Sequence, residues 1–254
     1  MSESEFKLPN PPIVEAVIDI ECDLPPGQQI ADLEERALGV FRDAYPKFRT
    51  QAFQEHQIDV KPGEAPVLSV KHGVQALQFL QDDEKQLVQV RVQGFSFNRL
   101  APYTSLDDYL PEIERTWRLY VDLTNPIQVR QIRVRFINRI LLPLAEKGVD
   151  LDHYFTVAPH LPDEDNLVFM GFLNQHAAIE VGTGNQVNIV LTAQSPEGNW
   201  LPVIFDNSVV DSSTCDAEDW PRILAKIQLL RDLKNRVFRR TLTKACLDLF
   251  QQQP

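Results

Sequence analysis

Residues 86–93 read QLVQVRVQ, and the alternation in this stretch decides the fold class that we expect. The valines at 88, 90 and 92 fall on one side of an extended chain, and the polar residues between them fall on the other. Such alternation is typical of a strand in a sheet with one packed face and one polar face. We therefore predict a strand over 87–97 in an antiparallel sheet.

Similar patterns recur along the chain, with helices between them. Apolar residues at helical spacing predict helices near 28–44, from Ser105 to Asn125-Pro126, and over 217–250. Extended segments predict strands at 13–21, 48–60, 67–70, 75–80, 127–142, 166–174, 177–181, 186–193 and 202–210. The fold class that we expect is α+β, with antiparallel sheets backed by long helices.

The loop from Pro143 to Asp150 is the best candidate for a boundary within the chain. It separates an N-terminal α+β half, residues 1–145, from a C-terminal half, residues 146–254, that ends in a long basic helix. Asn98-Arg99 and Asn138-Arg139 each end a strand between apolar residues, a short echo between the halves. Two similar halves and one continuous domain are both compatible with 254 residues.

Composition excludes several classes of protein. With 43% hydrophobic and 24% charged residues the chain is globular rather than disordered, and its net charge of −11 disfavours coating nucleic acid by bulk charge. It has no apolar run long enough to span a membrane, and acids stand where a signal peptide needs basic residues. Three cysteines without C-x-x-C spacing indicate neither disulfides nor zinc. We expect a cytoplasmic protein with no membrane partner.

The charge is unevenly distributed along the chain. Residues 221–254 contain eight basic and two acidic residues, a net charge of +6, which leaves −17 on the rest. Arginines also gather on the polar faces of two predicted strands, so a phosphate, a nucleic acid or an acidic protein surface could bind there. The candidate anion-binding residues are Arg91, Arg133, Arg135, Arg236, Arg239 and Arg240.

The alternative is that these arginines are neutralised by the chain's own acids. This alternative holds if Arg133, Arg135 and Arg139 all have carboxylate partners within the fold.

The sequence contains no recognisable catalytic signature. Phosphate-loop, dinucleotide, nucleophile-elbow and zinc-protease motifs are all missing from it. We therefore predict no catalytic residues, no metal and no cofactor, and favour a function without enzymatic activity.

Three segments carry a family resemblance: Leu8–Ile20 (LPNPPIVEAVIDI), Phe95–Ser105 (FSFNRLAPYTS) and Arg135–Pro143 (RFINRILLP). In them the chain resembles a sporadically distributed family of uncharacterised prokaryotic proteins of this length, which carry PPIxEAV, FSFxRLxPYTS and INRI motifs. It departs from that family in the last helix, where a His is frequent and Leu233-Lys234-Asn235 stands here. The residues that the resemblance singles out are Glu15, Asn98, Arg99, Tyr103, Thr104, Asn138 and Arg139.

These seven residues allow two interpretations. They form either a structural knot, in which Glu15 pairs with an arginine across the sheet, or a polar pocket for a small anionic ligand. The resemblance implies no activity, and its sporadic distribution points to a defence-linked gene. We expect a non-enzymatic binding protein that recognises another protein or a second copy of itself, such as an antitoxin or defence-system component. The alternative is a binder of a nucleotide or nucleic acid through the arginine-lined sheet face and the basic C-terminal helix.

Overall fold

A single antiparallel sheet runs through both halves of the chain in the computed structural model, which describes residues 8–59, 67–146, 148–162, 164, 167 and 169–251. Within these residues the sheet has nine strands in the order β2-β3-β4-β5-β1-β6-β9-β8-β7. The strands are β1 (Ile13–Asp23), β2 (Lys47–Asp59), β3 (Val67–Leu80), β4 (Gln86–Arg91), β5 (Gly94–Leu100), β6 (Gln128–Pro143), β7 (Leu173–Ile179), β8 (Gln186–Ala193) and β9 (Trp200–Asp211). The fold is α+β, as predicted, with more strand than helix.

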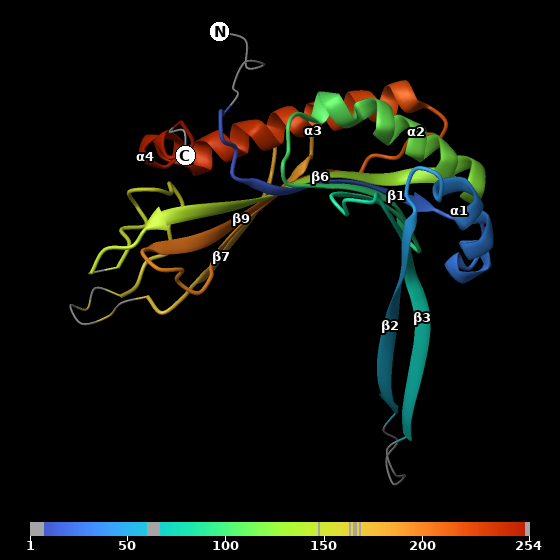
Figure 1. Cartoon of the computed structure of the whole chain (residues 1–254), viewed down its shortest axis with the longest axis horizontal. Helices are drawn as coiled ribbons and strands as arrows, with labels where there is room; N and C mark the ends of the chain where they lie inside the picture. The colour runs from blue at the N-terminus through green and yellow to red at the C-terminus, as the bar shows by residue number, and fades with distance from the viewer. Residues whose placement is uncertain are drawn as a thin grey trace.

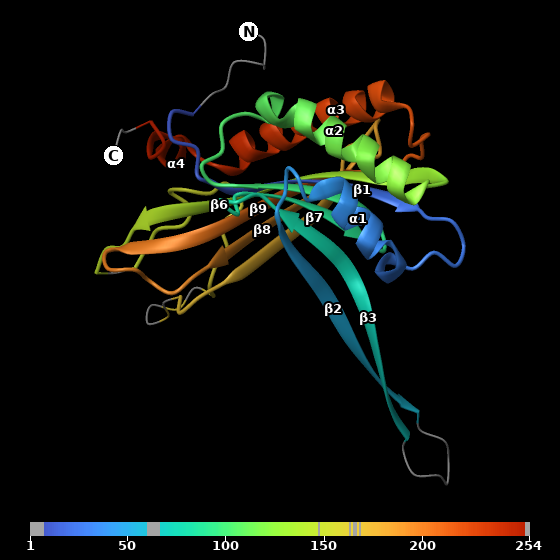
Figure 2. The ribbon, with the colours of Figure 1, turned by 45° about the vertical axis from the view of Figure 1, so that its right-hand side comes forward.

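The helices all lie on one face of this sheet (Figure 1). They are α1 (Glu34–Phe41), preceded by a 3-10 turn (Ile30–Leu33), α2 (Leu106–Thr124), α3 (Trp220–Thr241) and α4 (Lys244–Asp248). The long β2–β3 hairpin and the strands β7, β8 and β9 project away on the opposite side, so the helix-free face is concave (Figure 2). Within the described residues no helix is long and apolar enough to cross a membrane.

The main core fills the space between the sheet and α1, α2 and α3. Alternate residues of β1, among them Ile18 and Ile20, point toward the helices and are fully buried. Trp117 of α2 stacks on Tyr120, meets Phe95 edge-on and donates its indole N–H to a backbone carbonyl. Large aromatic side chains therefore fix α2 on the sheet, because each buries a wide apolar area.

The alternation at 86–93 predicts the faces of β4 correctly up to Arg91, but the chain then turns. Val92 and Gln93 form the connection to β5, and Val92 is half exposed. The predicted strand over 87–97 is therefore wrong, because it is a hairpin of two strands. Gly94 permits the turn with a φ of +139°, which L side chains rarely adopt.

Gly94 also packs directly against the backbone of β1. A Cβ at this position would lie 2.2 Å from the Ile20 carbonyl oxygen and 2.8 Å from Glu21 Cα. We expect Gly94→Ala to lower the free energy of unfolding by about 2 kcal/mol, since neither backbone atom can rotate away. Gly39→Ala in α1, where no atom would meet the Cβ, should instead stabilise by about 0.5–1 kcal/mol. Urea unfolding measures both, and equal stabilities would contradict this account.

The last predicted helix, 217–250, is wrong at both ends. Asp219 caps α3 by accepting from the Arg222 N–H, with Pro221 in the first turn. The helix stops at Thr241 because Leu242 forms a β-bridge with Phe155, and Thr156 donates its N–H to the Thr241 carbonyl. Backbone hydrogen bonds from the segment at Phe155 and Thr156 therefore end α3. The next helix, α4, begins after Thr243, which caps it.

The strand pattern beyond residue 160 also differs from prediction. One strand, β7, replaces the strands predicted at 166–174 and 177–181, and part of the first prediction lies outside the described residues. The predictions at 67–70 and 75–80 likewise merge into β3. The expected boundary at 145/146 falls just after β6, which pairs with β1 on one side and β9 on the other.

Candidate functional site

The seven motif residues lie on both faces of the sheet, so the single cluster that we expected does not form. Neighbouring residues of a strand point to opposite faces. Glu15 and Asn98 therefore lie on the helix-free face, whereas Arg99, next to Asn98, points toward α2 and lies over the Tyr109 ring. Arg139 also lies on the helix-free face, where it binds Glu197 and Gln194.

The expected ion pair of Glu15 with an arginine is also corrected. Within the described part of the chain Glu15 accepts a hydrogen bond of 2.7 Å from the Asn98 side-chain amide. Gln89 donates to Asn98 Oδ1 at 3.0 Å, and Gln78 donates to Gln89 Oε1 at 3.0 Å. A relay of polar side chains thus crosses four strands of the helix-free face, and each donor has an acceptor.

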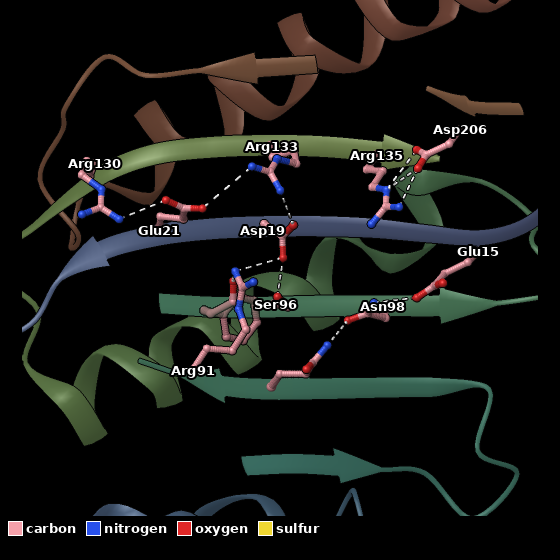
Figure 3. Close-up of polar contacts among 12 residues, drawn as sticks. Glu15, Asp19, Glu21, Arg91, Ser96, Asn98, Arg130, Arg133, Arg135 and Asp206 are labelled. Carbon is pink, nitrogen blue, oxygen red and sulfur yellow. Dashed lines mark hydrogen bonds and ion pairs between the residues drawn. The ribbon is translucent and has the colours of Figure 1, made fainter. Parts of the chain in front are cut away.

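Asp19 is the centre of the ionic network on this face (Figure 3). Its carboxylate is buried, accepts a hydrogen bond from the Ser96 hydroxyl and lies 3.0 Å from Arg91 Nη2. Arg133 approaches the same carboxylate at 3.9 Å and reaches Glu21 at 4.0 Å. Burying a carboxylate requires such partners, because an isolated charge is strongly disfavoured away from water.

Arg135 forms a separate pair with Asp206 on β9. Its Nε lies 2.9 and 3.0 Å from the two carboxylate oxygens, and Nη2 lies 2.5 Å from one of them. These hydrogen bonds raise the pKa of Arg135 above its ordinary value. Arg133, Arg135 and Arg139 all have carboxylate partners, which is the condition set above for self-neutralisation.

The remaining candidate arginines lie on the other side of the sheet. Arg236, Arg239 and Arg240 belong to α3, which covers the helix face, so the basic helix does not adjoin the arginines of the helix-free face. Arg236 is paired with Glu180 at 2.7 Å. An anion at Arg91, Arg133, Arg135 or Arg236 must therefore compete with carboxylates of the chain itself.

A cavity of about 530 Å³ lies on the helix face, between the start of α2, the middle of α3 and the segment that leads into β1. Three of the seven motif residues line it, namely Tyr103, Thr104 and Asn138. Pro11 and Pro12 of the first motif segment line it too. Residues that are far apart in the sequence thus meet at one site.

Lys234 is the functional candidate in this cavity that the sequence analysis missed. Its side chain lines the cavity, is only 5% exposed, and lies with Nζ 3.6 Å from the centroid of the Phe136 ring. No hydrogen bond or ion pair reaches its Nζ from the part of the chain that the structure describes. Burial, assisted by the nearby charge of Arg231, lowers the pKa of Lys234 to about 7.

A signal for Lys234 was available in the sequence. It follows Ile227 by seven residues and Leu230 by four, so it occupies the apolar stripe of the helix rather than its solvated side. It also stands where the resemblance shows a departure from the family pattern. A lysine on an apolar stripe has at least its aliphatic stem in the core, which singles it out from the solvated lysines of a helix.

The comparisons with known proteins do not name a function. No protein-family model matches the chain. No curated protein matches it either. Within the described residues, no group of three or more His, Cys, Asp or Glu side chains could hold a metal ion.

Proposed function

We propose that the protein is a non-enzymatic, cytoplasmic binding module that holds a partner polypeptide by strand addition at β7. The observation that carries this proposal is the exposed edge of β7, the last strand of the sheet. Leu173 and Ile179 are about two-thirds exposed, and Val181 is almost fully exposed just beyond the strand. Exposed apolar side chains beside an unpaired strand edge are typical of a surface that binds an extended peptide.

The two edges of the sheet differ in a way that supports this proposal. β2 begins with Lys47 and Arg49, both paired with Glu84, and charged side chains at an edge discourage a further strand. β7 reads LNQHAAI and contains no Asp, Glu, Lys or Arg. An edge without charged residues favours pairing with another chain.

The hydrogen bonds of β7 identify the backbone groups that point away from β8. Ala193 N donates to the Phe172 carbonyl and Glu180 N donates to the Asn185 carbonyl, one pair at each end of the β7–β8 ladder. Because ladder bonds alternate along an antiparallel pair, even-numbered residues of β7 bond to β8. The N–H and C=O groups of residues 173, 175, 177 and 179 therefore point outward.

The occupant that we propose is a strand of a different polypeptide, neutral or basic, with apolar side chains. The chain's net charge of −11 disfavours the approach of a second copy, whereas it attracts a basic partner. The sporadic distribution of the family that the chain resembles suggests a mobile or defence-linked gene. We therefore propose that the protein is an antitoxin or defence-system component and that the strand comes from its partner protein.

Ala177→Pro tests this proposal, because it removes one outward N–H and leaves the even-numbered ladder to β8 intact. We expect the wild-type protein to capture a partner from the lysate of its source organism and the variant to lose it. The captured polypeptide, purified alone, should bind Ala177→Pro at least about tenfold more weakly.

Ala177→Val is the matched control, because it keeps the N–H and favours the strand. It should bind the purified partner as the wild type does. Equal binding by all three proteins would contradict strand addition at β7. A wild-type dimer in size-exclusion chromatography that Ala177→Pro abolishes would show that β7 binds a second copy of the chain and not a different polypeptide.

We also propose that the two halves are related by a repeat. The strand order supports it when the halves divide between α2 and β6 rather than at 145/146, so that β6 is the first strand of the second half. The first strands, β1 and β6, are then central, the last strand of each half (β5, β9) lies next to them, and the earlier strands follow outward. A long helix follows each set of strands, α2 in one half and α3 in the other. The two Asn-Arg pairs give no support. One lies in β5, the last strand of the first half, and the other lies in β6, the first strand of the second half, so a repeat would not align them.

The alternative function, nucleotide or nucleic-acid binding, has weaker support. It needs free arginines, whereas Arg91, Arg133, Arg135 and Arg236 have carboxylate partners.

A further inference from the structure

Two polar atoms of buried residues that line the helix-face cavity have no hydrogen bond or ion pair within the described residues. One is the side-chain oxygen of Asn138, a residue that is 1% exposed. The other is the amine of Lys234, a residue that is 5% exposed, whose Nζ contacts the Phe136 ring. A buried polar group without a hydrogen bond costs free energy, and a buried ammonium without a counter-ion costs more. Both atoms belong to residues that line the same cavity, so one occupant could satisfy both.

The orientation of the Asn138 amide is fixed by its other atom. Nδ2 donates to the Phe205 carbonyl at 3.0 Å and to the Phe136 carbonyl at 3.3 Å. A flipped amide would set its oxygen against two carbonyl oxygens, so Oδ1 is the atom left free. The cavity thus offers an acceptor from Asn138 and a donor from Lys234.

We propose that this cavity binds a small monocarboxylate with an apolar body, whose carboxylate pairs with the Lys234 ammonium and whose N–H or O–H group donates to Asn138. A volume of about 530 Å³ suits a small molecule. Leu8, Ile13, Phe136 and Phe238 supply the apolar part of walls that also carry many polar side chains. This site is independent of the strand addition proposed above, since it lies on the helix face.

The charges around the cavity favour a single negative charge on the ligand. Asp107 and Asp108 contribute from the start of α2, and Asp232 contributes from α3. Arg231 is engaged by two of these acids, at 2.6 Å from Asp107 and 3.6 Å from Asp232. A dianion such as phosphate would meet this acidic rim with only one unpaired ammonium to receive it. Water could satisfy Asn138, but it would leave the ammonium without a counter-ion.

The test is isothermal titration calorimetry of the full chain with 4-hydroxybenzoate, 4-hydroxyphenylacetate and 6-hydroxyhexanoate, each of which carries an O–H donor as well as a carboxylate, and with 4-hydroxybenzamide and inorganic phosphate as comparison probes. We expect at least one carboxylate to bind at pH 7, and to bind more tightly than 4-hydroxybenzamide or phosphate. At pH 8 the binding should take up protons, because the carboxylate favours the charged form of the amine. Heats measured in buffers of different ionisation enthalpy report that uptake.

Lys234→Met removes the amine and keeps the length of the side chain. It should weaken carboxylate binding by about 10- to 100-fold, the loss expected for a charge-assisted hydrogen bond. Lys226→Met is the matched control: Lys226 is a second buried lysine of α3, but its Nζ lies 3.0 Å from Asp211. It should leave carboxylate affinity unchanged. If Lys234→Met does not fold, Lys234→Gln replaces it with the same expected loss.

Two results would overturn the proposal. One is the failure of all three carboxylates to bind the wild-type protein. The other is binding that persists at wild-type affinity in the folded Lys234 variant, which would place the carboxylate elsewhere. Neither result would bear on β7, whose test uses a different variant and a different ligand.

Discussion

Asp19→Asn is expected to lower the free energy of unfolding by about 3 kcal/mol, among the largest effects of a single substitution in this chain. The Asp19 carboxylate is buried on the helix-free face. There it accepts a hydrogen bond from the Ser96 hydroxyl and lies within 4 Å of Arg91 and Arg133. The amide keeps the volume of the side chain but removes the charge. Arg91, whose side chain is 21% exposed, then lacks its counter-ion, and the unpaired cation accounts for most of the loss.

Glu114→Gln provides the matched control for this prediction. Glu114 pairs with Arg118 one helical turn away at 2.7 Å, but the pair lies at the surface of α2. Its loss should cost less than about 0.5 kcal/mol, because solvent screens exposed pairs. Equal effects of the two variants in urea unfolding would show that the Asp19 network is not structural, and would reopen the helix-free face as an anion site.

The second large effect concerns pH. The pKa of Lys234 falls from 10.5 to about 7 on folding, so between these values the unfolded chain holds one more proton than the native chain. Stability therefore rises as pH rises through this window, by about 1 kcal/mol per pH unit. Besides Lys234, the titratable and charged groups that line the cavity are Arg231 and Asp232 from α3, Asp107 and Asp108 from the start of α2, and Tyr103 from the segment before it.

Lys234→Met isolates this effect, since every other titrating group stays in place. The free energy of unfolding of the variant should exceed that of the wild type at pH 7, and the difference should shrink toward pH 9. Urea unfolding at half-unit steps of pH measures the difference. A constant difference over this range would mean that the amine is not desolvated in the native state.

The alternation of residues in single strands could be predicted from the sequence, but the relation between strands could not. The pattern at 86–93 assigns Gln89 and Arg91 to the polar face, and the structure agrees. It did not reveal the turn at Gly94, because Val92 continues the alternation while the backbone reverses.

The motif residues illustrate a second limit. Asn98 and Arg99 are adjacent in the sequence, yet the pleat of β5 places them on opposite faces. A motif read as one cluster therefore divides between the polar network and the helix face.

Long-range contacts account for the remaining differences. The helix predicted to reach residue 250 ends at Thr241 because Phe155 pairs with Leu242, a contact that no local pattern contains. The cavity is formed in the same way, since Pro12, Tyr103, Asn138 and Lys234 come from four separate segments. Of these, Tyr103 and Asn138 were singled out by the motifs that contain them. Lys234 carried a signal that was missed, its place on the apolar stripe of α3.

Hydrogen exchange of the amides in β7 tests the central proposal most directly. The measurement compares the free protein with its complex with the purified partner. Strand addition predicts that the outward amides of residues 173, 175, 177 and 179 become protected in the complex, while those of β2 at the other edge exchange unchanged. Unchanged exchange of these four amides in a saturated complex would contradict the account.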